Sequence, residues 1–236
     1  MNWSNFDQIY CIHFRPHKER WEGLNKEFER IELLNAPNFQ FWYTDKEKRN
    51  NVATVARKHI DVYKDAIEHG YNKILVMEND IRFHNDLSYI DWYINNMPVD
   101  YDLILFDYVY GYWAKELERI SILRQNNNDS KWINIGYDSK VWSCGCYALS
   151  QKMMNHIKIN QENGGYSCGP DYFTTYKEES IDQEIDKLLI RYVPFNNVAI
   201  QKTYINNLRM IIRGSDNTYK RYVAQGTPIQ NYNIFV

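Results

Sequence analysis

Several features that would assign this chain to a special class are missing. It has only 4 cysteines in 236 residues, too few for a disulfide scaffold. It has 10 glycines and 6 prolines, which excludes collagen-like and low-complexity compositions. No apolar run approaches the ~20 residues that a transmembrane helix needs, and the mean hydropathy is −0.64. These absences leave a globular domain with a sizeable core.

An excess of charge of one sign is also missing. The 28 basic residues nearly balance the 30 acidic ones, for a formal net charge of −2. Proteins that bind nucleic acid or anionic membranes usually carry a basic surface, so we expect neither partner. The first residues, Met-Asn-Trp-Ser-Asn-Phe-Asp, contain no basic segment followed by an apolar one. We therefore expect no signal peptide and a cytoplasmic protein.

The four cysteines are expected to be reduced thiols. Only Gly145 separates Cys144 from Cys146, whereas a local zinc knuckle usually places two to four residues between its first ligands. Small residues packed on a strand are the simpler interpretation.

Aromatic residues, in contrast, are abundant. The chain has 20 Tyr, 10 Phe and 7 Trp, together 16% of its residues. This is more than a core of this size needs, so we expect many tyrosines to be partly exposed. Rings with one polar tip suit a wet binding surface.

Apolar patterning along the chain alternates between two periods. Short apolar runs predict strands, and segments with helical periodicity predict the helices between them. The strands are expected at residues 9–14, 39–43, 73–77, 102–106, 141–149 and 191–200, and the helices at 16–33, 51–69, 87–96, 151–159 and 181–189. This alternation predicts a single α/β domain with a mostly parallel central sheet.

An acidic turn follows the most hydrophobic of these strands. Glu78-Asn79-Asp80 comes directly after the run 73–77, at the end of a strand where α/β proteins bind ligands. Glu78 and Asp80 can face one ligand together, because alternate residues of an extended chain point the same way. Paired carboxylates suit Mg²⁺ or Mn²⁺; an ordinary solvated turn is the alternative. Neither a P-loop nor a dinucleotide-binding fingerprint is present, so a metal would have to bind most of a diphosphate.

Two stretches carry a resemblance to a known family. One runs from a helix into the acidic turn, Val55-Ala-Arg-Lys-His59 and Gly70-Tyr-Asn-Lys-Ile-Leu-Val-Met-Glu-Asn-Asp80. The other is the opening strand and turn, Ile9-Tyr-Cys-Ile-His-Phe-Arg15-Pro-His-Lys-Glu-Arg20. Together they resemble glycosyltransferase family 25, which includes bacterial lipopolysaccharide glycosyltransferases and procollagen galactosyltransferases. Two later segments, 146–150 and 180–186, are similar to that family more weakly.

The sequence departs from the family pattern at three positions. Asn79 replaces the middle acid of a Glu-Asp-Asp motif, Lys58 replaces the Ser before His59, and His13 replaces the Asn of the first strand. Glu78 and Asp80 are retained, so metal binding stays plausible on chemical grounds.

The resemblance implies a single GT-A type domain, with a nucleotide-sugar half of about residues 1–110 and an acceptor half of about residues 111–236. It implies an inverting transfer of a hexose from a UDP-sugar, with Mn²⁺ or Mg²⁺, to a glycan, a lipid-linked saccharide or a collagen-like protein. The expected residues are Glu78 and Asp80 for the metal, Arg15, His59, Glu78, Asn79, Asp80 and Asp107 near the donor, Asp182 or else Glu184 as the base, and Trp142 and Tyr147 near the acceptor.

These assignments differ in origin. Asp107 is placed by geometry alone, because it ends a predicted strand. Trp142 and Tyr147 are chosen as aromatic residues close to the expected cleft, where sugars stack on rings. His59 is expected to support other site residues and not to act in catalysis. Asp182 and Glu184 fit the acceptor-side base that inversion requires, although an ordinary acidic helix start is the alternative.

Two other functions stay open. A metal-dependent enzyme acting on a phosphate ester would also use paired carboxylates, but such sites usually recruit more Asp and His ligands. The other is a catalytically inactive glycosyltransferase-like protein that binds a sugar or nucleotide sugar. Asn79 and the absence of any histidine after His156 are its main support.

Overall fold

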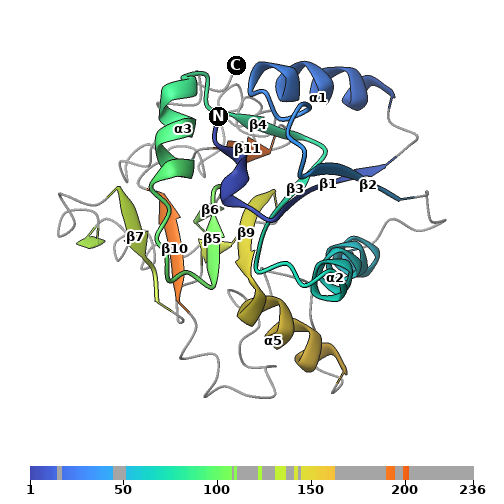
Figure 1. The fold of residues 1–236 in the computed structure, drawn as a ribbon, viewed down its shortest axis with the longest axis vertical. Helices are drawn as coiled ribbons and strands as arrows, with labels where there is room; N and C mark the ends of the chain where they lie inside the picture. Colours follow the sequence, from blue (N-terminus) through green and yellow to red (C-terminus); the bar gives the residue numbers. More distant parts are fainter. Residues whose placement is uncertain are drawn as a thin grey trace, which may run out of the picture.

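A computed structural model describes residues 1–14, 18–44, 52–107, 109–110, 122–123, 131–136, 141–142, 145–162, 190–194 and 199–201. Over these residues the chain forms a central sheet of seven strands with helices on both faces (Figure 1). None of the described helices is long and apolar enough to cross a membrane.

The first half of the chain supplies strands and helices in alternation. They are a 3-10 turn η1 (Trp3–Asn5), β1 (Gln8–Phe14), α1 (Lys18–Arg30), β2 (Phe39–Thr44), α2 (Val52–Glu68), β3 (Lys73–Glu78), β4 (Ile81–Phe83), α3 (Leu87–Asn95), β5 (Leu103–Leu105) and β6 (Val109–Tyr110). The second half supplies β7 (Trp132–Asn134), β8 (Val141–Trp142), β9 (Cys146–Ser150), α5 (Gln151–Glu162), β10 (Arg191–Pro194) and β11 (Ala199–Gln201).

The central sheet mixes both strand directions. Its order is β2-β1-β3-β9-β5-β10-β7. The pairs β1–β2, β1–β3 and β5–β10 are parallel, whereas β9 is antiparallel to β3 and β5, and β7 is antiparallel to β10. Only β9 and β7 are therefore reversed, which confirms the predicted α/β class with a mostly parallel sheet. Strands from both halves of the chain share this sheet.

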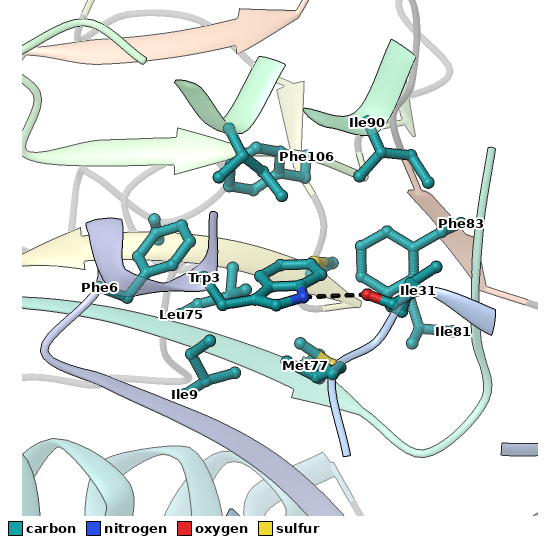
Figure 2. Packing of buried hydrophobic residues seen from close by; sticks show 14 of the residues in the cluster. Trp3, Phe6, Ile9, Ile31, Leu75, Met77, Ile81, Phe83, Ile90 and Phe106 are labelled. Atoms are coloured by element: carbon teal, nitrogen blue, oxygen red, sulfur yellow. Dashed lines mark hydrogen bonds between the residues drawn. The ribbon is translucent and has the colours of Figure 1, made fainter. Parts of the chain in front are cut away.

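Each face of the sheet carries its own hydrophobic cluster. Ile74 and Val76 of β3 belong to the cluster that includes residues of α2 and α5. Leu75 and Met77 belong to the cluster with residues of α1 and α3, which also contains Trp3. Figure 2 shows this second cluster, in which Nε1 of the buried Trp3 donates to the Ile31 carbonyl at 3.0 Å. Burial on both sides explains why residues 73–77 are uniformly apolar.

Local signals in the sequence explain how two helices are bounded. Gly70 follows α2 with φ +72°, a left-handed conformation that glycine adopts without steric cost. At the start of α3, Oδ1 of Asp86 accepts hydrogen bonds from the backbone N–H of Ser88 at 2.9 Å and of Tyr89 at 3.4 Å. These bonds satisfy amides that a helix start leaves without partners.

Two predicted strands were wrong in extent. The run 141–149 is divided between β8, which pairs with β6 in a separate two-stranded sheet, and β9, which lies in the central sheet. The run 191–200 is divided between β10 in the central sheet and β11, which pairs with β4. Apolar patterning reports burial and not the pairing partner, so it joined strands that belong to different sheets. The predicted helix 181–189 lies outside the described residues.

Candidate functional site

The acidic residues lie at the edge of the sheet where the carboxyl ends of β1, β3 and β5 meet. Glu78 ends β3, pairs in register with Ile12, and donates its backbone N–H to the Gly145 carbonyl at 2.9 Å. Asp107 follows β5, and its backbone N–H donates to the Cys146 carbonyl at 3.2 Å. The start of β9 therefore links the two acidic strand ends.

The acidic turn alternates between an open and a buried side. The Glu78 side chain is 24% exposed and Asp80 is half-buried, whereas Asn79 between them is only 4% exposed. The Asn79 amide nitrogen lies 3.3 Å from Nδ1 of the buried His13 on β1. The amide donates, so this ring nitrogen accepts. Asn79 therefore contacts β1.

His59 reaches Glu78 from α2. Its Nε2 lies 3.3 Å from Oε1 of Glu78, and its Nδ1 lies 2.6 Å from the hydroxyl of Tyr147 on β9. The hydroxyls of Tyr147 and Tyr63 are 2.5 Å apart. His59 is 1% exposed, so it belongs to the buried face of α2. This contact with Glu78 is consistent with the supporting role expected for His59.

The charges of these carboxylates affect the pKa of two buried thiols. Burial raises the pKa of the Cys11 thiol, and the charges of Glu78 and Asp80 raise it further. Burial also raises the pKa of the Cys146 thiol, with further contributions from Asp107 and Cys11. Glu78 and Asp80 thus act on the same buried thiol. Cys11 and Cys146 are free and buried; the sequence predicted free thiols for both and packing on a strand for Cys146.

The other expected site residues have different placements. Tyr147 has 0% exposure, and its hydroxyl is bonded within the core. This corrects the expected acceptor contact, because a side chain with no exposed surface cannot touch an acceptor in this conformation. Asp107 is also fully buried, and Trp142 lies in β8. Arg15, Asp182 and Glu184 lie outside the described residues.

A divalent cation was expected at Glu78 and Asp80. The described part of the chain contains no group of three or more His, Cys, Asp or Glu residues arranged around a metal position. Ions such as Mg²⁺ take one or two carboxylates from proteins and keep several waters. Glu78 and Asp80, both half-buried at the carboxyl end of β3, therefore fit such an ion in donor chemistry.

Tyr63 is a site residue that the sequence did not indicate. It packs on the buried face of α2 with 1% exposure. The available signal was its spacing of four residues from His59, which places both side chains on one face of a helix.

Comparisons with known proteins were made at three levels. No family model matches the sequence, so the resemblance to glycosyltransferase family 25 stays a prediction. No curated protein is significantly similar to it either.

The solved structures that match this chain include two transferases. One is a glycosyltransferase involved in the glycosylation of the major capsid of PBCV-1, with a TM-score of 0.48, 10% identity and coverage of 93% of this chain and 98% of that chain. The other is mouse xyloside xylosyltransferase 1, with a TM-score of 0.34, 7% identity and coverage of 76% and 79%. At such identities these likenesses assign no activity to this chain.

Proposed function

We propose that this protein is a metal-dependent inverting glycosyltransferase that moves a hexose from a UDP-sugar to a hydroxyl of a glycan or glycoprotein. The observation that carries the proposal is the pair Glu78 and Asp80, two half-buried carboxylates at and just after the carboxyl end of β3. Open α/β sheets bind ligands at this edge. The same residues stand in the block that resembles glycosyltransferase family 25.

Glycosyl transfer requires that the negative charge on the leaving group be neutralised. Transfer breaks the bond between the anomeric carbon and a diphosphate, whose oxygens gain negative charge. A bound Mn²⁺ or Mg²⁺ stabilises that charge. Glu78 and Asp80 would hold the ion, and the hydrogen bond from His59 would orient the Glu78 carboxylate.

The remaining roles come from the sequence. Inversion requires a base that takes the proton of the acceptor hydroxyl; Asp182 is assigned to it, with Glu184 as the second choice. Arg15 is assigned to the donor diphosphate or nucleobase, because guanidinium forms paired hydrogen bonds to such groups. Acceptors of the expected classes are a glycan, a lipid-linked saccharide and a collagen-like protein.

Hydrolysis of UDP-sugars provides a direct test, because glycosyltransferases often transfer the sugar to water when no acceptor is present. The assay can therefore be run before the acceptor is known. We expect the wild-type protein to release UDP from at least one UDP-hexose when Mn²⁺ is present, and not after chelation with EDTA. Glu78→Gln and Asp80→Asn should reduce the rate at least tenfold. Glu68→Gln is the matched control, since Glu68 is an exposed carboxylate at the end of α2.

The same samples distinguish the proposed enzyme from the alternative, an inactive protein that binds a sugar or nucleotide sugar. If UDP with Mn²⁺ raises the Tm but no UDP-sugar is turned over with any acceptor class, the inactive alternative is favoured. If UDP with Mn²⁺ produces neither stabilisation nor turnover, the proposal is wrong.

A further inference from the structure

We propose that Tyr147 and Tyr63 are positioning residues for the metal-binding carboxylate, acting through His59. Together the four side chains form one hydrogen-bonded chain, Tyr63–Tyr147–His59–Glu78, which fixes the orientation of the Glu78 carboxylate. This inference rests on the proposed function for the role of Glu78 as a metal ligand.

Each contact in this hydrogen-bonded chain is short, and three of its four side chains are buried. The three separations, from Tyr63 to Glu78, are 2.5, 2.6 and 3.3 Å. Tyr63, Tyr147 and His59 have exposures of 1%, 0% and 1%, and only Glu78, at 24%, reaches the solvent edge. The chain therefore connects the inside of the core to Glu78, a carboxylate that reaches solvent.

The direction of each hydrogen bond follows from the groups involved. An ionised Glu78 can only accept, so Nε2 of His59 must carry a hydrogen. Nδ1 of a neutral ring then accepts, which requires the Tyr147 hydroxyl to donate to it. The oxygen of Tyr147 in turn accepts from the Tyr63 hydroxyl. Each donor has an acceptor, and the chain selects the one neutral tautomer of His59 that can hold Glu78.

The fold builds this chain from three separate elements. His59 and Tyr63 lie one turn apart on α2, and Tyr147 lies on β9 between Val76 of β3 and Leu105 of β5. The reversed strand β9 thus carries a phenol to the face of the sheet that α2 covers. Its hydroxyl sits in an apolar cluster with Ile12, Val76 and Leu105 as members.

Polar groups buried in an apolar cluster are unfavourable unless an interaction compensates for them. Each costs free energy unless it is fully hydrogen-bonded, and Phe would pack in place of either tyrosine without that requirement. A satisfied polar network, however, holds its members in one arrangement. Groups that orient metal ligands commonly affect metal affinity by 10–100-fold when they are removed. Loss of the Tyr147 hydroxyl frees His59 to take the other tautomer, which cannot donate to Glu78 from Nε2.

The test measures Mn²⁺ binding to the free protein, with no sugar nucleotide, by calorimetry and by the EPR signal of unbound Mn²⁺. We expect Tyr147→Phe to weaken Mn²⁺ binding by roughly 10-fold or more, and Tyr63→Phe to have a smaller effect. Tyr101→Phe is the matched control, because Tyr101 is a tyrosine in the other cluster with 4% exposure and no hydrogen-bond partner for its hydroxyl among the described residues. It should bind Mn²⁺ as the wild type does.

Two further measurements distinguish a positioning role from a purely structural one. They are the Mn²⁺ affinity of His59 variants and the kinetics of UDP-sugar hydrolysis. His59→Gln keeps a side-chain N–H donor and should retain more Mn²⁺ affinity than His59→Leu. In UDP-sugar hydrolysis, Tyr147→Phe should raise the KM for Mn²⁺ while kcat at saturating Mn²⁺ changes little.

Two results would overturn the inference in different ways. If the wild type binds Mn²⁺ and folded Tyr147→Phe and Tyr63→Phe bind it equally tightly, the positioning role is wrong and the proposed function stands. If the wild type binds no Mn²⁺, the metal site of the proposed function fails, and the positioning role fails with it.

Discussion

The amide of Asn79, in the turn after β3, lies 3.3 Å from the imidazole of His13 on the adjacent strand β1. Both side chains are buried, at 4% and 2% exposure. They are also two of the positions at which the sequence departs from the family that it resembles, so the two departures lie in direct contact. Asn79 is therefore better explained as the partner of His13 than as a lost ligand.

This contact predicts coupling between the two positions. Asn79→Asp places a carboxylate beside a buried imidazole and removes the amide donor, so we expect it to lower the free energy of unfolding by about 1–3 kcal/mol. Adding His13→Asn, which restores the residue pair of the family pattern, should recover part of this loss, with a coupling energy of about 1 kcal/mol. Urea unfolding of the two single variants and the double variant measures it. Strictly additive effects would contradict the pairing.

Replacing tyrosine by phenylalanine should have opposite effects on the free energy of unfolding at two buried positions, 101 and 147. The Tyr101 hydroxyl has no partner among the described residues, so Tyr101→Phe should raise the free energy of unfolding by about 1 kcal/mol. The Tyr147 hydroxyl contacts both His59 and Tyr63, so Tyr147→Phe should lower it by about 1–3 kcal/mol. Urea unfolding of both variants checks this. A loss of stability in Tyr101→Phe would show that its hydroxyl is bonded.

The buried thiols predict a pattern of chemical modification. The thiolate is the reactive form, and burial together with nearby carboxylates raises the pKa of both Cys11 and Cys146. Iodoacetamide at pH 7 should therefore leave both residues unmodified in the native protein and alkylate them in denaturant. Mass spectrometry of the digested protein locates the label. Rapid native labelling of either residue would be incompatible with this environment.

The start of α3 predicts a pH-dependent contribution to stability. Hydrogen bonds from Ser88 and Tyr89 lower the pKa of Asp86 below its ordinary value of 3.8. Because the folded pKa is the lower one, the stabilisation is fully present above pH 3.8 and is lost as the pH falls through the folded value. Asp86→Ala should thus lower the Tm at pH 7, and the difference should become smaller in strong acid.

Asp86→Asn is the control for this helix start. Asparagine caps helices about as well as aspartate does, but it does not titrate. Its Tm should therefore stay close to that of the wild type at pH 7, and it should exceed that of Asp86→Ala even in strong acid. A Tm difference between wild type and Asp86→Ala that is independent of pH would contradict the role of the Asp86 charge.

Local patterns in the sequence predicted elements well where one segment forms one element. The helix expected at 51–69 is α2 (Val52–Glu68), and the strand expected at 73–77 is β3 (Lys73–Glu78). Prediction failed where partners differ along a segment, as in 141–149 and 191–200. The three-residue strand β4 (Ile81–Phe83) was not predicted, because it is too short to show a period.

The sequence by itself determined the class of the fold, the position of Glu78 and Asp80 after a buried strand, and the packing of Cys146 on a strand. These properties depend on the order and spacing of side chains along one segment. Only the tertiary structure decided that Asn79 lies against His13 and that Tyr147 supports His59 from inside the core. Those contacts join residues 66 and 88 positions apart, and no local pattern records which distant side chain a folded sheet brings into reach.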